Sequence, residues 1–117
     1  MKPAIAAVAL VTTAALLTGC GGPPADASKR EFCTQLKKIN AEKSWKDTKK
    51  SVAALEGIGT PSGIPQDARA GFVDLVGYTA DAKDRAALVK KIEKLGKSDR
   101  KHLDAFDSYI SKTCTSS

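Results

Sequence analysis

An uncharged apolar run near the N-terminus decides how much of this chain is available to fold. Lys2 is followed by no other charged residue before Asp26, and positions 4–17 contain only Ala, Ile, Val, Leu and Thr. These 14 residues are fewer than the about 20 that a membrane-spanning helix requires. A positive start and an apolar run of this length are typical of an export signal. We therefore expect the run to be removed before the domain folds.

The residues after the apolar run differ from an ordinary Ala-x-Ala cleavage site. They read Leu17-Thr18-Gly19-Cys20, which resembles the lipobox of bacterial lipoproteins. The resemblance implies that residues 1–19 are a lipoprotein signal peptide, cut after Gly19, and that Cys20 is lipidated with a diacylglycerol. The alternative is a secreted protein with a cysteine at this position by chance. Two or more acyl chains hold a protein stably on a membrane.

The segment directly after Cys20 is rich in glycine and proline. Because these residues resist both helix and strand, we expect residues 20–28 to be a lipidated, flexible tether and residues 29–117 to be the helical domain. After cleavage no remaining run is long enough to span a bilayer. The predicted location is therefore the extracytoplasmic face of the cell membrane, with the lipid on Cys20 as the anchor.

Two further cysteines indicate a disulfide. With Cys20 lipidated, Cys33 and Cys114 remain, and an even pair in an exported protein is typical of a structural bridge. A redox pair or a pair of metal ligands is the alternative. However, redox sites usually contain Cys-x-x-Cys, and a zinc site needs more Cys or His than this chain has. We predict that Cys33 and Cys114 are bonded and that no metal or other cofactor is needed.

The residue pattern after the predicted cleavage site, from Cys20 onward, predicts helices and no strands. Ser28 and Glu31 form the Ser-x-x-Glu pattern of a capping box, and no alternating strand pattern of useful length follows. We predict an all-α fold, a small helical bundle of four to five helices stapled by one disulfide. The predicted inner faces carry Phe32, Cys33, Leu36 and Ile39; then Val52 and Leu55; then Ala68, Phe72, Leu75, Val76 and Thr79; then Leu88, Val89, Ile92 and Leu95; and finally Leu103, Phe106, Ile110 and Cys114.

Glycine, proline and serine mark the predicted helix ends. The second helix should stop within residues 57–61, and the third should begin with Pro65 near its first position. Gly96 is expected to end the fourth helix as a left-handed cap, and Ser98 to cap the last helix. Because the disulfide joins the first turn of the first helix to the end of the last, an up-and-down bundle requires an even number of long helices. One of the five should therefore be short or merged with its neighbour.

Several features together resemble the small two-cysteine lipoproteins of actinobacteria. They are the lipobox cysteine, the Gly/Pro linker, Glu31-Phe32-Cys33, the stretch from Gly59-Thr60-Pro61 through Ile64-Pro65 to Ala68-Arg69-Ala70-Gly71-Phe72, and Tyr109-Ile110 before Cys114. The resemblance covers nearly the whole mature chain. It implies the location and a two-cysteine helical fold, and it implies no activity.

No residue pattern in the sequence points to catalysis. His102 is the sole histidine, has no recognisable nucleophile pattern around it, and is expected at the boundary or the surface of the last helix. Asp67, Asp74, Asp81 and Asp84 surround the third helix and are interpreted as a solvated face, although a carboxylate pair among them could act as acid and base. We predict that the protein is not an enzyme.

Positive charge is concentrated in two regions of the mature chain. Removing residues 1–19 takes away only Lys2 and leaves a formal charge of +5. Basic side chains outnumber acidic ones by eight to four in residues 28–56 and by seven to four in residues 90–117, whereas residues 57–89 carry three basic and four acidic side chains. The hypothesis is that a lysine cluster binds anionic lipid headgroups or an acidic envelope polymer; the alternative is a lysine-rich face that only aids solubility. Export argues against nucleic acid as a partner. The cluster consists of Lys37, Lys38, Lys43, Lys46, Lys49 and Lys50.

Two classes of function remain open from the sequence. The first is an interaction module that binds an envelope protein, a peptide or a polymer, and it is preferred because a short chain has little core to spare for a cavity. The second is a carrier or sensor of a small ligand. An apolar pocket of a few hundred Å³ beside the third helix would favour the carrier, whereas a filled core with an exposed apolar patch would favour the module.

Overall fold

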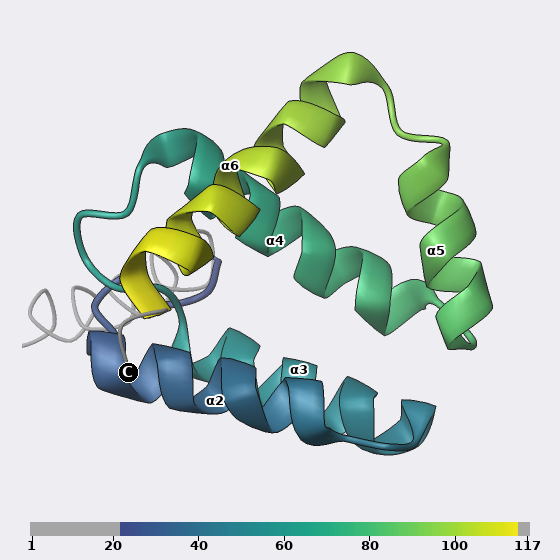
Figure 1. The fold of residues 1–117 in the computed structure, drawn as a ribbon, viewed down its shortest axis with the longest axis horizontal. Helices are drawn as coiled ribbons and strands as arrows, with labels where there is room; N and C mark the ends of the chain where they lie inside the picture. The colour runs from purple at the N-terminus through teal and green to yellow at the C-terminus, as the bar shows by residue number, and fades with distance from the viewer. Residues whose placement is uncertain (1–21, 115–117) are drawn as a thin grey trace, which may run out of the picture.

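The computed structural model describes residues 22–114, so the predicted signal peptide (residues 1–19) and the predicted lipidation site Cys20 lie outside the described residues. The described part has five helices and no strand, which confirms the all-α prediction. Figure 1 shows α2 and α3 side by side, α6 crossing α4, and α5 standing apart. The helices are α2 (Lys29–Ala41), α3 (Trp45–Ile58), α4 (Gln66–Asp81), α5 (Arg85–Glu93) and α6 (Lys97–Cys114).

Serine side chains begin the first two helices. The Ser28 hydroxyl accepts a hydrogen bond from the backbone N–H of Glu31 at 3.0 Å, and the Ser44 hydroxyl accepts one from Asp47 at the same distance. Each bond satisfies one of the amides that the first turn of a helix leaves without a partner. The predicted start of the first helix is therefore confirmed.

Two predicted helix ends are wrong, and both lie around the turn between α5 and α6. Gly96 does not adopt a left-handed conformation; α5 ends at Glu93 with Lys94 as its C-cap. Helix α6 already begins at Lys97, so Ser98 lies inside it and does not cap it. The turn comes earlier in the chain than expected, because α5 already ends at Glu93, where the backbone N–H of Lys94 bonds back to carbonyls of the last turn. Pro65, by contrast, precedes α4 directly, close to its predicted position.

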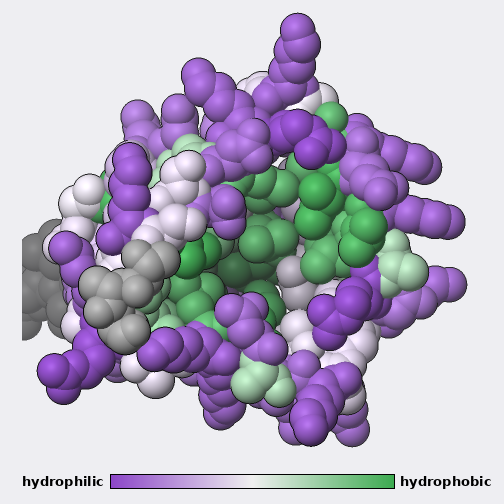
Figure 2. All heavy atoms as spheres, viewed as in Figure 1, coloured by the Kyte–Doolittle hydropathy of each residue, from purple (hydrophilic) through white to green (hydrophobic). Residues whose placement is uncertain are grey.

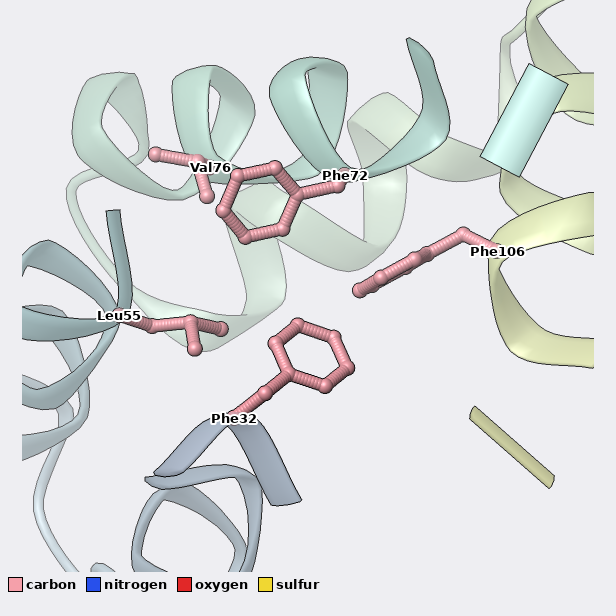
Figure 3. Packing of buried hydrophobic residues seen from close by; sticks show 5 residues of the cluster. All are labelled: Phe32, Leu55, Phe72, Val76 and Phe106. Atoms are coloured by element: carbon pink, nitrogen blue, oxygen red, sulfur yellow. The ribbon is translucent and has the colours of Figure 1, made fainter. Parts of the chain in front are cut away.

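Five apolar side chains from four helices form the core. Phe32 and Phe72 are fully buried, and the rings of Phe72 and Phe106 lie 5.7 Å apart at 62°. Tilted arrangements of this kind suit the ring quadrupoles. Figure 3 shows these rings together with Leu55 and Val76, all pointing toward one another. The predicted inner faces of α2, α3, α4 and α6 are thus the ones that pack.

The contact between α4 and α6 is the most extensive in the domain, and Gly71 makes it possible. A Cβ at this position would overlap the backbone carbonyl of His102 and press on Phe106. Only glycine lets the two backbones approach this closely, and their approach brings Phe72 and Phe106 into contact.

The predicted disulfide is confirmed. Cys33 in the first turn of α2 is bonded to Cys114, the last residue of α6, with a Cα–Cα separation of 5.5 Å. The two helix ends are therefore neighbours, as the prediction of an even number of long helices requires. Helix α5, with 9 residues, is the short one, since the other four have 13 to 18.

The described part of the expected tether, residues 22–28, is hydrogen-bonded to the turn between α3 and α4. The Arg69 guanidinium donates to the carbonyls of Pro23 and Pro24, and the Thr60 N–H also donates to Pro24 at 3.0 Å. Gly59 has a φ of 86°, and a Cβ there would overlap the Pro24 carbonyl. We call residues 22–28 the docked segment.

Candidate functional site

An apolar cleft opens in the middle of the domain. Its volume is about 350 Å³, and all five helices contribute to its lining. Figure 2 shows an apolar hollow framed by hydrophilic side chains. Four of the lining residues belong to the core, namely Leu55, Phe72, Val76 and Phe106. The walls are partly buried apolar residues that extend the predicted inner faces, namely Leu36, Ile39, Val52, Leu75, Leu88 and Ile110.

The cleft exists because α5 does not close over it. No residue of α5 is buried, and Leu88 is the one member of its apolar stripe that reaches the cleft lining. A helix that packed fully onto α2 and α3 would fill this space with its apolar face. Instead, α5 is held near its two ends, by the turn before it and by hydrogen bonds that Arg100 donates to Ile92 and Glu93.

Trp45 and Arg85 form one polar edge of the cleft. The indole N–H of Trp45 donates to the Ala82 carbonyl at 3.3 Å, and the Lys49 ammonium donates to the same oxygen at 3.1 Å. The Arg85 guanidinium lies 5.6 Å from the centre of the Trp45 ring, a cation–π distance. It also donates to the Thr48 hydroxyl at 3.4 Å. We call Trp45, Thr48, Lys49 and Arg85 the cationic edge.

Ionisable groups are few in the lining. Among the described residues, those that line the cleft and carry charge are Arg85 and Asp107, on different helices. Such a lining can hold an apolar molecule and orient its polar end. A nucleophile with an adjacent base would be a different arrangement, and the cleft lining in residues 22–114 does not present one.

A second cluster joins α4 to α6. Nδ1 of His102 lies 3.6 Å from a carboxylate oxygen of Asp74, and Asp99 brings a further oxygen within 4.8 Å of both. Burial, followed by the charges of Asp74 and Asp99, raises the pKa of Tyr78 above its ordinary value. Carboxylates and imidazole are ligands that zinc accepts. Because Asp99 is exposed and the other two are only partly covered, this cluster is a weaker candidate site than the cleft.

The sequence did not reveal that cluster because Asp74 lies on α4, far along the chain from Asp99 and His102 on α6. Asp74 is partly covered, as is His102, whereas Asp67, Asp81 and Asp84 are exposed, as a solvated face requires. Asp84 also caps α5, since its carboxylate accepts from the Ala87 N–H at 2.8 Å.

The six lysines of the predicted anionic-binding surface do not share one site. Lys37 lines a shallow depression beside the disulfide, together with Lys29 and Arg30. Lys38 and Lys50 line a different depression that also contains Glu42 and Asp47. Lys49 belongs to the cationic edge, and Lys43 and Lys46 are exposed.

Three comparisons with known proteins found no match to this chain. No protein-family model matches the chain, and no curated protein or solved structure is significantly similar to it. The resemblance to actinobacterial lipoproteins therefore stays a prediction. No helix within residues 22–114 is long and apolar enough to cross a bilayer.

Proposed function

We propose that this chain is a lipid-anchored protein of the extracytoplasmic membrane face, and that its helical domain binds a small, mainly apolar ligand in the central cleft. The observation that carries the second part is the 350 Å³ apolar cleft beside α4. That volume falls at the lower end of the range of about 300–1,000 Å³ typical of ligand sites. A carrier or sensor that does not catalyse a reaction is the corresponding role.

The cleft costs the domain burial energy that a ligand can restore. Apolar surface that stays in water forgoes about 25 cal/mol for each Å², and a small domain has little such energy in reserve. A bound apolar molecule covers the walls of the cleft, so it stabilises the folded state by mass action. The apolar walls of the open cleft therefore favour a carrier over an interaction module.

The interaction module has less support on the described surface. In residues 22–114 the large apolar side chains classed as exposed are Val73 on α4 and Val89 on α5, at 40% and 47%. Single exposed valines on two different helices do not make the contiguous patch that marks a protein interface.

The membrane anchor is supported by the sequence from Leu17 to Cys20 and by the disulfide. A structural bridge between Cys33 and Cys114 is typical of the oxidising conditions outside the cytoplasm, so it supports the export that such an anchor presupposes. Metabolic labelling with a palmitate analogue tests the anchor directly. We expect label in the wild-type chain and none in Cys20→Ala; equal labelling of both would refute lipidation at this residue.

Ligand binding is testable on the lipid-free chain from Gly21 onward, because the packing described above lies within residues 22–114. The probe is N-phenyl-1-naphthylamine, an uncharged fluorophore that brightens in apolar sites. We expect saturable binding that Val52→Phe, which fills the cleft, weakens by about tenfold, equivalent to 1.4 kcal/mol.

Val73→Phe is the matched control, since it adds the same bulk at an exposed position of α4 outside the cleft lining. It should leave the affinity for the probe unchanged. No saturable binding by the folded wild-type chain, or equal loss in both variants, would contradict a ligand site in the cleft.

A further inference from the structure

We infer that the ligand of the cleft is a single-chain amphiphile with an anionic head, whose head lies against Arg85 and whose chain lies in the cleft against Phe72 and Phe106. This inference rests on the proposed function and names the chemistry of its ligand. The site is asymmetric, because its walls are apolar and its positive charge lies at one place, the cationic edge.

The charge of Arg85 has no carboxylate to neutralise it. Among residues 22–114, no Asp or Glu oxygen lies within ion-pair distance of its guanidinium, and its hydrogen bond to Thr48 is long, at 3.4 Å. A guanidinium has five N–H donors in a planar fork that matches a carboxylate or a phosphate. Most of that capacity therefore remains for a ligand.

Arg85 is also held in place. Its guanidinium stacks over the ring of Trp45, and that ring is fixed by the hydrogen bond to Ala82. Although Arg85 is exposed, these contacts favour one position of its guanidinium, so less side-chain entropy is lost when a ligand binds. Lys49, which bonds to the same Ala82 carbonyl, adds a second positive charge to this edge.

The cleft sets the size of the apolar part. A volume of about 350 Å³ is at the small end for ligand sites, which suits one alkyl chain better than the two chains of a phospholipid. The chain would lie along Leu36, Val52 and Phe106, which come from three different helices. The other charged lining residue, Asp107, lies on α6 and not on the cationic edge.

A set of ligands with one chain length and different heads tests the inference. Laurate, lauryl phosphate, lauryl alcohol and laurylamine would each displace N-phenyl-1-naphthylamine from the lipid-free chain at mildly alkaline pH, below their micelle concentrations. We expect the better of the two anions to bind about tenfold more tightly than the alcohol, as a charge-assisted hydrogen-bonded pair implies. Laurylamine should bind more weakly than the alcohol. Tighter binding of laurate would indicate a ligand with a carboxylate head, and tighter binding of lauryl phosphate a ligand with a phosphate head.

The matched variants are Arg85→Gln and Asp107→Asn. Arg85→Gln should abolish the preference for the anions over the alcohol, while Asp107→Asn, which removes the negative charge of the lining, should bind the anions no more weakly than the wild-type chain does. Equal binding of all four ligands by the wild-type chain would overturn the anionic head and leave the apolar site standing. Absence of both probe and alcohol binding would instead overturn the proposed function. The comparison of the four ligands needs no variant, so it decides the matter even where Arg85→Gln misfolds.

Discussion

Gly71 of α4 lies so close to the backbone carbonyl of His102 in α6 that a methyl group between them would overlap the oxygen. Gly71→Ala should therefore push the two helices apart and separate Phe72 from Phe106. We expect a loss of about 1–3 kcal/mol in the free energy of unfolding, the usual cost of overpacking, measured by urea denaturation.

Gly77 provides the control on the same helix. A Cβ there meets nothing within 4 Å, so Gly77→Ala should stabilise the domain by about 0.5–1 kcal/mol through reduced backbone entropy in the unfolded chain. Equal effects of the two substitutions would show that the approach of α4 to α6 does not depend on Gly71.

Arg69 should hold the docked segment in place. Arg69→Leu removes the hydrogen bonds to the carbonyls of Pro23 and Pro24. Loss of these charge-assisted bonds should raise the hydrogen-exchange rates of the Ala27 and Thr60 amides by about tenfold. Arg100→Leu, at the other end of the molecule, should leave both rates unchanged, and unchanged rates in Arg69→Leu itself would contradict the role of Arg69.

Removing the disulfide should destabilise the domain strongly. Cys33 and Cys114 are 81 residues apart, and the chain-entropy model assigns about 4.5 kcal/mol to a closed loop of this length. The double variant Cys33→Ala/Cys114→Ala should melt at a much lower temperature in calorimetry. Wild-type chain in reductant should melt near the same temperature as the variant; a melting temperature equal to that of the oxidised protein would disprove the stabilising role.

Tyr78 should make the domain less stable in alkali. Desolvation, then the charges of Asp74 and Asp99, raise its pKa above 10.0. The folded chain therefore keeps a phenolic proton that the unfolded chain releases, so the stabilisation is fully present below the unfolded pKa. It is lost as pH rises from about 10 through the folded pKa.

The phenolate absorbance of a Tyr109→Phe chain would report this titration. It should show Tyr78 ionising at a higher pH when folded than in urea. Asp74→Asn should lower the folded pKa of Tyr78, because one of the negative charges is removed. Coinciding titrations of the folded and unfolded chains would contradict the prediction.

Local signals in the sequence were sufficient for most of the fold. The stripe that begins at Phe32, the cap at Ser28 and the pairing of Cys33 with Cys114 each depend on residues whose roles follow from spacing or from cysteine count. The predicted left-handed cap at Gly96 was wrong, because glycine permits that conformation without requiring it.

The candidate site could not be predicted in the same way. Trp45 and Arg85 are brought together by the turn that follows α4, and nothing local marks either as a partner of the other. Likewise, the glycines and prolines of the docked segment predict an irregular backbone, but they do not predict its hydrogen bonds to Arg69 and Thr60. Contacts of this kind depend on tertiary packing, which a periodic pattern does not encode.

The position of the disulfide also fixes how the domain carries mechanical load. Because Cys33 is bonded to Cys114 at the last residue of α6, a pull applied between the two ends of the chain passes through the bond and bypasses α3, α4 and α5. Tension would first peel the docked segment from Arg69 and then unwind the first turn of α2, up to Cys33. Phe32, which precedes the bond, would be the one core residue under load. The residues that line the cleft all lie between Cys33 and Cys114 and would carry no tension, so the protein could be pulled by its N-terminus without opening the cleft.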